Sequence, residues 1–194
     1  MNKTTAPIKT LKFTRFGNPI LRTKAAAINP TDIGSNIVQQ LISDMRYTVE
    51  KEASGVGLAA PQVGVGKALA LIAIKPTKNR PDRERFESII INPRYEGIGR
   101  RVGMWEGCIS AGRGNDTLFG RALRYQKIHA SWYDENGVEH MEVLDGFVAH
   151  VFQHETDHLD GILFVDRVKD RTTFMMADEY RTRIVSKEKS GSNK

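Results

Sequence analysis

The chain has 194 residues, 40% of them hydrophobic and 27% charged, which is typical of soluble globular domains. This length fits one domain, so we expect a single domain over residues 1–194, with residues 1–15 as a flexible arm and 185–194 as a disordered tail. The one cysteine excludes a disulfide framework, and no apolar run approaches the roughly 20 residues of a membrane-spanning helix. The N-terminus also lacks an apolar leader, so the sequence predicts a cytoplasmic protein without a membrane partner.

The formal net charge is +6, and basic residues gather at both ends of the chain. Residues 1–24 hold six Lys or Arg and no acid, and residues 167–194 hold eight basic and four acidic side chains. Such ends can attract a polyanion such as RNA, or they can be solvated segments that aid solubility. We favour solvated segments, because no aromatic residues alternate with the basic ones to stack on bases.

The first predicted elements are a turn at residues 16–21 and a helix of about 20 residues. The helix should start at residues 30–32, capped by Asn29 or Thr31, and end near residues 53–55. Its apolar face is marked by residues that recur at four-residue spacing: Ile33, Ile37, Leu41, Met45 and Val49.

A glycine-rich segment, residues 55–66, separates this helix from a group of predicted strands. Three strand-like runs cover residues 68–74, 86–92 and 94–105, and the polar residues 75–84 form a hairpin or loop between the first two. No dimer seam is evident in these segments, so we expect a monomer.

The second half of the chain contains a loop, a hairpin and a second helix. Residues 111–120 have the composition of a loop, and Asn136-Gly137 between alternating strands indicates a hairpin. The second helix should cover residues 145–161, with Asp145 as its cap and Gly161 at its end. A short strand at 162–168 and a helical tail complete the expected elements.

This order of elements favours the α+β class over an alternating α/β fold. We expect antiparallel β-sheets packed around a central helix, the one at residues 145–161, with further helices toward the N-terminal and C-terminal ends of the chain.

The strongest chemical signal is His154-Glu155-Thr156-Asp157-His158, an H-E-x-x-H sequence on the second predicted helix. Four residues of α-helix turn by about 400°, so the imidazoles of His154 and His158 project from one face about 6 Å apart and can grip one metal ion. Glu155 lies next to the first ligand, where its carboxylate can act as a base on a water molecule. An ordinary histidine pair on a surface helix is less favoured, because the preceding residues are strongly apolar.

A catalytic metal site with two histidines needs a third protein ligand. The residues leave two options open. One is Cys108, in the sequence EGCIS, which by itself could equally be an inert buried thiol. The other is an acidic residue downstream of the histidines: Asp160, Asp166, Asp170, Asp178 or Glu179.

The segment GVGLAA (55–60) formally matches the glycine pattern of dinucleotide-binding proteins. That pattern requires a preceding strand and a following helix, whereas here a helix precedes and a strand follows. A phosphate-binding P-loop is also excluded, because Gly66-Lys67 is followed by Ala68. The glycines instead allow the backbone to approach another group closely, with the amide of Gln62 nearby.

Together, GVGLAAPQ (55–62), EGCIS (106–110) and QHETDHLDG (153–161) resemble the three signature motifs of the peptide deformylases, in the family's order and near its spacings. FGNPILR (16–22) is similar to the family's N-terminal turn, with Asn18 where an aspartate is usual. The resemblance spans about residues 10 to 168. It implies that Cys108 is the third metal ligand beside His154 and His158.

The resemblance also implies a function. The family removes the N-formyl group from the initiator methionine of nascent chains and releases formate, with a metal-activated water and Glu155 as the general base. The cofactor implied is one divalent metal ion, most often iron(II), and nickel, cobalt or zinc can take its place. The partners implied are N-formyl-methionyl peptides, with the ribosome as a candidate through the basic ends.

Further site residues follow from the resemblance. The side chain of Gln62 and the backbone N–H of Ile109 would hold the developing oxyanion. The backbone of Gly57 and Gly107 would pair with the extended substrate. The methionine pocket would draw on five residues: Val56, Met104, Phe147, His150 and Val151.

Two departures from the family pattern leave other hypotheses open. The loop after Ser110 is unusual, so the chain could be a diverged metallo-amidase for another N-acyl substrate. The basic ends leave open a third hypothesis, a non-catalytic module that docks on RNA or the ribosome. His150 stands where relatives carry an aliphatic residue or arginine. It could narrow the pocket, but we expect it to form a hydrogen bond at the helix surface.

Overall fold

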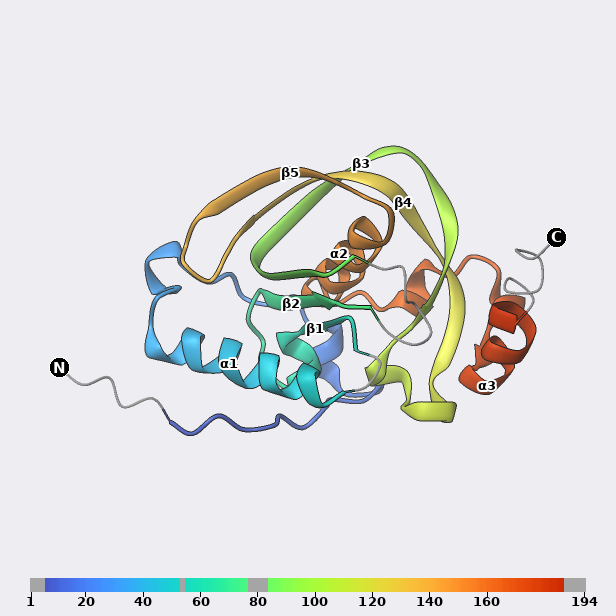
Figure 1. Cartoon of the computed structure of the whole chain (residues 1–194), viewed down its shortest axis with the longest axis horizontal. Coiled ribbons are helices and arrows are strands. Elements are labelled where there is room, and N and C mark those ends of the chain that lie inside the picture. Colours follow the sequence, from blue (N-terminus) through green and yellow to red (C-terminus); the bar gives the residue numbers. More distant parts are fainter. Residues whose placement is uncertain (1–5, 53–54, 77–83, 187–194) are drawn as a thin grey trace.

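A computed structural model of the chain describes residues 6–52, 55–76 and 84–186. It confirms the α+β class: a curved antiparallel sheet wraps around one central helix, α2, and further helices lie toward each end of the chain (Figure 1). Instead of several sheets, the described strands form one continuous sheet.

The sheet has the strand order β1-β2-β3-β4-β5, and every pairing is antiparallel. A short sixth strand pairs with β4 beyond this path. The strands are β1 (Gly57–Ala59), β2 (Leu69–Ile74), β3 (Phe86–Gly107), β4 (Leu118–Tyr133), β5 (Glu139–Asp145) and β6 (Met175–Met176).

The first helix, α1 (Asn36–Lys51), starts later than the sequence predicts. Residues 30–32 form a separate 3-10 turn capped by Asn29, and the hydroxyl of Ser35 then accepts a hydrogen bond from the backbone N–H of Val38 to begin α1. The expected apolar face is buried at Met45 and Val49, but Ile37 in the first turn is 84% exposed.

The central helix, α2 (Gly146–Leu159), is close to the prediction. Asp145 occupies the N-cap position, but its side chain makes no capping bond, which corrects the expectation. Gly161 ends the helix as expected: it adopts a positive φ of 73°, and its N–H bonds to the carbonyl of His158, as in a Schellman motif. Phe152 and neighbouring apolar residues of α2 pack on the inner face of the sheet against Ile72.

Two of the predicted strands, 86–92 and 94–105, are one long strand, β3. Pro93 lies in a register shift between Ile91 and Arg94, so its missing N–H does not break the ladder. Asn92 adopts a φ of 50° at this shift, and its side chain bonds both backbone groups of Ile28.

The remaining predicted elements have mixed outcomes. The hairpin at Asn136-Gly137 joins β4 to β5 as expected. The strand expected at 162–168 is wrong, because residues 164–167 form a 3-10 turn in which the Asp166 carboxylate accepts the N–H of Leu163. The expected loop 111–120 begins with the last residue of one short 3-10 turn, contains a second at Gly114–Asp116 and runs into the start of β4. The expected helical tail consists of α3 (Ala177–Tyr180) and a π-helical turn to Val185; of the polar segment 75–84, residues 77–83 lie outside the described part.

The N-terminal segment, expected as a flexible arm, is fastened to α1 from Lys9 onward. The backbone N–H of Lys9 donates to the Asp44 carboxylate at 3.0 Å, and that of Leu11 donates to the Thr48 hydroxyl at 2.9 Å. Residues 1–5 and the tail 187–194 lie outside the described residues, so the expectations for them stay predictions.

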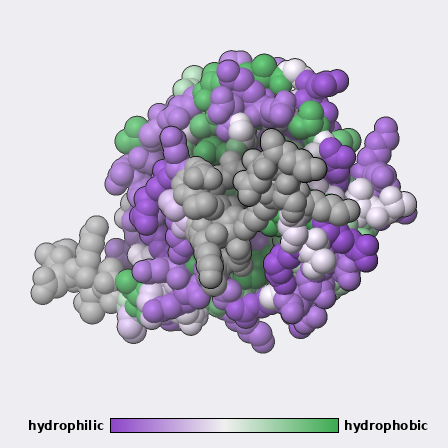
Figure 2. Space-filling view, turned by 45° about the vertical axis from the view of Figure 1, so that its right-hand side comes forward, coloured by the Kyte–Doolittle hydropathy of each residue, from purple (hydrophilic) through white to green (hydrophobic). Residues whose placement is uncertain are grey.

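Most side chains on the face shown in Figure 2 are hydrophilic, with hydrophobic ones scattered between them. Among the described residues, no helix combines the length and the apolar character needed to cross a bilayer.

Candidate metal centre

The structure brings together the three residues for which the sequence suggests metal binding. Cys108 follows the end of β3, while His154 and His158 lie one turn apart on α2. The Sγ atom of Cys108 lies 3.3 Å from Nε2 of His158, and one ligand atom from each of the three residues lies within 4.8 Å of the others. A thiolate and two imidazoles at this spacing suit a borderline divalent metal and leave room for a further ligand.

The charges at this centre favour cation binding. Burial raises the pKa of the Cys108 thiol, but His158 and His154 outweigh burial and hold that pKa well below its usual range. Burial lowers the pKa of His154, but Cys108 and Glu106 outweigh burial and hold it well above its usual range. When no metal is bound, these shifts favour the thiolate and the imidazolium, and a divalent cation can take the place of the imidazolium proton.

Glu106, for which the sequence alone predicts no role, lies behind the centre. Its Oε2 atom is 2.7 Å from Nδ1 of His154, and its Oε1 atom is 2.9 Å from Nε2 of His150. Burial raises the pKa of Glu106, but Arg124 and the two histidines together outweigh burial and hold that pKa well below its usual range. The ionised carboxylate can only accept hydrogen bonds. Both imidazole nitrogens that face it therefore carry hydrogens, and Nε2 of His154 is the nitrogen left for a metal.

Arg124 on β4 completes this buried network and was also missed. Only 1% exposed, it donates to both oxygens of Glu106, at 2.6 and 3.0 Å, and to the carboxylate of Asp157 on α2. The half-buried Arg167 also donates to Asp157, from Nη2 to Oδ1 at 2.7 Å and from Nε to Oδ2 at 2.9 Å. The network ties β3 and β4 to the helix that carries both histidines.

Glu155 lies beside these three candidate ligands and is buried, with 3% of its surface exposed. Burial raises the pKa of its carboxyl from 4.5 to about 7, against the lowering effect of His154 and His158. Its Oε2 atom has no hydrogen-bond partner among the described residues. A proton acceptor tuned near neutrality and free to bind a further group is what general-base chemistry requires.

The glycine-rich segment leaves room for the buried carboxylate of Glu155. A Cβ atom on Gly57 would lie only 2.2 Å from Oε1 of Glu155, so only glycine lets β1 pass this close to the carboxylate. Among the described strands, β1 also forms one edge of the sheet. An edge strand offers unpaired backbone groups to an added strand.

The amide of Gln62 points into the same site. Its Oε1 atom accepts the backbone N–H of Ala59 at 2.8 Å, which directs Nε2 toward Sγ of Cys108, 3.3 Å away, and Oγ of Ser110, 3.4 Å away. Ile109 directly follows Cys108 in a short 3-10 turn, and Gly107 directly precedes it at the end of β3.

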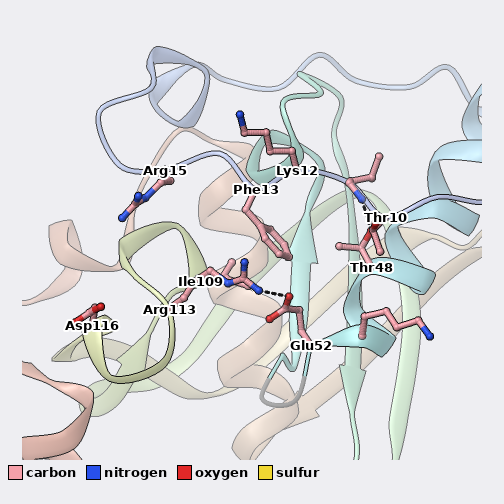
Figure 3. Close-up of a pocket in the computed structure, with 11 residues that line it drawn as sticks. Thr10, Lys12, Phe13, Arg15, Thr48, Glu52, Ile109, Arg113 and Asp116 are labelled. Atoms are coloured by element: carbon pink, nitrogen blue, oxygen red, sulfur yellow. Dashed lines mark hydrogen bonds and ion pairs between the residues drawn. The ribbon is translucent and has the colours of Figure 1, made fainter.

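A cavity of about 590 Å³ opens beside Ile109, between residues 10–15, the end of α1 and the loop after Cys108 (Figure 3). Within it, Arg113 lies over the ring of Phe13 and forms an ion pair with Glu52. On the other side of the loop, Asn115 accepts a hydrogen bond from Arg181. Two side chains of the loop after Cys108 are thus anchored, Arg113 at the end of α1 and Asn115 at the π-helical turn that follows α3.

The residues expected to form the methionine pocket lie in three different surroundings. Val56 and Phe147 pack against the same core cluster as Val151. Met104 lies on β3 opposite Ala122. His150 was expected at the helix surface, but this is wrong: it is 5% exposed and bonds inward to Glu106, because α2 lies inside the curved sheet.

Comparison with known proteins settles the family. The profile of the family described as Polypeptide deformylase matches residues 10–174. The chain belongs to this family. A peptide deformylase of Leptospira biflexa is 40% identical over 171 residues, covering 84% of this chain and 90% of the relative. Peptide deformylase 2 of a Nostoc species is 38% identical over 181 residues, covering 92% and 97%.

Solved deformylase structures share the fold. A class I type b peptide deformylase from Acinetobacter baumannii with bound Met-Ala-Ser has a TM-score of 0.75 and 32% identity, covering 82% of this chain and 98% of that one. A Synechococcus elongatus deformylase in complex with actinonin has a TM-score of 0.71 and 32% identity, covering 89% and 86%. The deformylases are metal-dependent hydrolases of N-formyl peptides, and Cys108, His154 and His158 form a possible metal site in this member.

Proposed function

We propose that this deformylase removes the N-formyl group from the N-terminal methionine of nascent proteins and releases formate. The observation that carries the proposal is the buried carboxylate of Glu155, beside three metal-ligating side chains that converge from two distant parts of the sequence. The methionine-first peptide Met-Ala-Ser bound to the Acinetobacter relative supports the same substrate class.

We propose that Cys108, His154 and His158 hold one divalent ion, iron(II) in the cell, with nickel, cobalt or zinc as functional substitutes. The donor set of one thiolate and two imidazoles supports a borderline metal. When bound, such an ion supplies a Lewis acid that lowers the pKa of water toward neutrality.

Glu155 serves as the base and then as the acid. Its carboxylate takes a proton from the attacking water while the water oxygen bonds to the formyl carbon. When the carbon–nitrogen bond breaks, Glu155 gives the proton to the departing amine of methionine. A pKa near 7 suits a group that must take and return a proton at neutral pH.

Gln62 and Ile109 stabilise the oxyanion that forms on the formyl oxygen. The hydrogen bond from Ala59 fixes the Gln62 amide with its N–H groups toward Cys108, so the donor is oriented before the substrate arrives. The backbone N–H of Ile109 supplies the second donor. Loss of one such donor typically costs about 3–4 kcal/mol of barrier.

The extended substrate adds to the free edge of β1, pairing with the backbone at Gly57 and Gly107. Backbone pairing tolerates many side chains, so one enzyme can act on many different nascent chains. The methionine side chain enters a pocket formed by Val56, Met104, Phe147, His150 and Val151.

The direct test is formate release from formyl-Met-Ala-Ser by protein purified and loaded with iron under nitrogen. We expect turnover by the wild type and its loss in Glu155→Ala protein that keeps its metal. Acetyl-Met-Ala-Ser is the matched control substrate. If the acetyl peptide were cleaved and the formyl peptide were not, the chain would be an amidase of another specificity. A cytoplasmic location, a monomeric state and contact with the ribosome stay predictions.

A further inference from the structure

His150 is a buried polar residue for which the proposed chemistry gives no sufficient reason. It lies one helical turn before His154 on α2, and its side chain is 7% exposed. Its Nε2 atom lies 2.9 Å from Oε1 of Glu106, while Nδ1 has no partner among the described residues. Burying an imidazole is costly in free energy unless it forms hydrogen bonds. The bond to Glu106 is therefore the polar contact that explains how the His150 ring is oriented.

The carboxylate of Glu106 links the two histidines, because each of its oxygens bonds to a different one. Oε1 accepts from His150 and Oε2 accepts from His154, while Arg124 donates to both oxygens. Arg124 approaches from β4, so it fixes the carboxylate from one side only. The bond from His150 is a further hydrogen bond from α2 itself, and it sets the rotation of the carboxylate relative to the helix that carries His154.

We propose that His150 is a positioning residue: by holding Glu106, it keeps His154 oriented with Nε2 toward the metal. The inference rests on the metal site of the proposed function. Residues that orient a metal ligand typically change metal affinity by 10- to 100-fold when removed. Because His150 acts through Glu106, we expect an effect near the lower limit of that range.

The test compares three substitutions at this position in cobalt-loaded protein. Gln can place an N–H near the position of Nε2, Asn places its amide near the position of Nδ1, and Leu keeps much of the volume without a donor. We expect His150→Leu and His150→Asn to release cobalt to a chelator about 10-fold faster than wild type. We expect His150→Gln to restore slow release.

The visible absorption spectrum of the bound cobalt gives a second readout that does not depend on turnover. A change in the orientation of His154 should shift the ligand-field bands in the Leu and Asn variants and leave the Gln variant like wild type. His129→Leu is the matched control, because His129 is exposed on β4. It should change neither the spectrum nor the release rate.

A third measurement, NMR of the imidazole protons, uses metal-free protein. In imidazole NMR spectra, the Nδ1–H proton of His154 bonded to Glu106 should give a downfield signal that is kept in His150→Gln and lost or shifted in His150→Leu. Unchanged release, cobalt spectrum and NMR signal in His150→Leu would overturn the proposal, as would an effect confined to KM for the peptide, which would make His150 a substrate contact. Failure of the wild type to deformylate would instead refute the proposed function, because the cobalt release, the cobalt spectrum and the NMR signal are all measured without a substrate.

Discussion

The imidazole of His154 is held from behind by Glu106, with 2.7 Å between Nδ1 and Oε2. The two residues are 48 positions apart, one on α2 and one on β3. Cys108 lies two residues after Glu106 in sequence. In the proposed site, one strand end therefore supplies both a metal ligand and the residue that holds another ligand, so the site depends on how α2 packs against β3.

Substitutions at Cys108 and Glu155 should separate metal binding from proton transfer. Cys108→Ser should weaken or abolish metal retention, because a hydroxyl is a far poorer ligand than a thiolate for a borderline metal. Glu155→Gln should keep the metal and lower kcat by roughly 10²–10⁴-fold, because only the base is removed. Elemental analysis and formate release on the same samples check both. Full metal content in Cys108→Ser would argue against the ligand assignment.

Glu155 should destabilise the metal-free protein at alkaline pH. Its folded pKa of about 7 lies above the usual 4.5, so the folded state loses stability as the pH rises from 4.5 through 7. Glu155→Gln, which mimics the neutral acid, should stabilise the metal-free protein at pH 8 by about 3 kcal/mol and have little effect at pH 4. Urea unfolding at the two pH values measures this. Equal stabilities at pH 8 would show that the carboxyl is not destabilised by burial.

Gly57 should not tolerate even alanine. The added Cβ would lie 2.2 Å from Oε1 and 2.7 Å from Cδ of Glu155, so either β1 or the Glu155 carboxylate must move. We expect a loss of kcat/KM of at least about 100-fold, because displacement of a catalytic group by about 1 Å can cost that much. Gly66→Ala is the control, since a Cβ there meets nothing within 4 Å. Near-normal kcat/KM in Gly57→Ala would contradict the close approach.

Arg124 should matter far more for stability than its exposed counterpart Arg113. Arg124→Met leaves the carboxylates of Glu106 and Asp157 buried with fewer partners, and should lower the free energy of unfolding by about 3–5 kcal/mol. Arg113 is 62% exposed and pairs with Glu52, so Arg113→Met should cost less than about 1 kcal/mol. Urea unfolding of metal-free protein compares them. Similar small effects would mean that the buried network contributes little.

Local periodicity was enough to find α2 and the histidine pair on it. The spacing of His154 and His158 places both on one helix face whatever surrounds the helix, and Gly161 marks its end. Cys108 was different: its approach to the histidines depends on how β3 packs against α2, which no local pattern contains. The family resemblance, not the residues themselves, identified it as the third ligand.

Glu106 and Arg124 were missed although the chain carries a signal for one of them. Along β4, the buried positions alternate, and Arg124 is the charged member of a series that includes Ala122 and Ile128. A cation on the inward face of a strand needs a buried partner. Glu106 carries no comparable signal, because its role depends on contacts with another element.

The wrong prediction of a strand at residues 162–168 has a similar cause. A short apolar run is compatible with a strand or with other buried segments, and periodicity does not distinguish them. Here the Asp166 side chain bonds the N–H of Leu163 and favours a 3-10 turn, so this backbone group is unavailable to a strand ladder.

Anomalous diffraction at the metal absorption edge, from crystals of protein purified without oxygen, tests the central claim most directly. We expect a single strong peak roughly 2.0–2.3 Å from Sγ of Cys108 and from Nε2 of both His154 and His158. A metal-replete protein whose ion lies elsewhere, or whose Cys108 sulfur lies beyond bonding distance of the ion, would contradict the account.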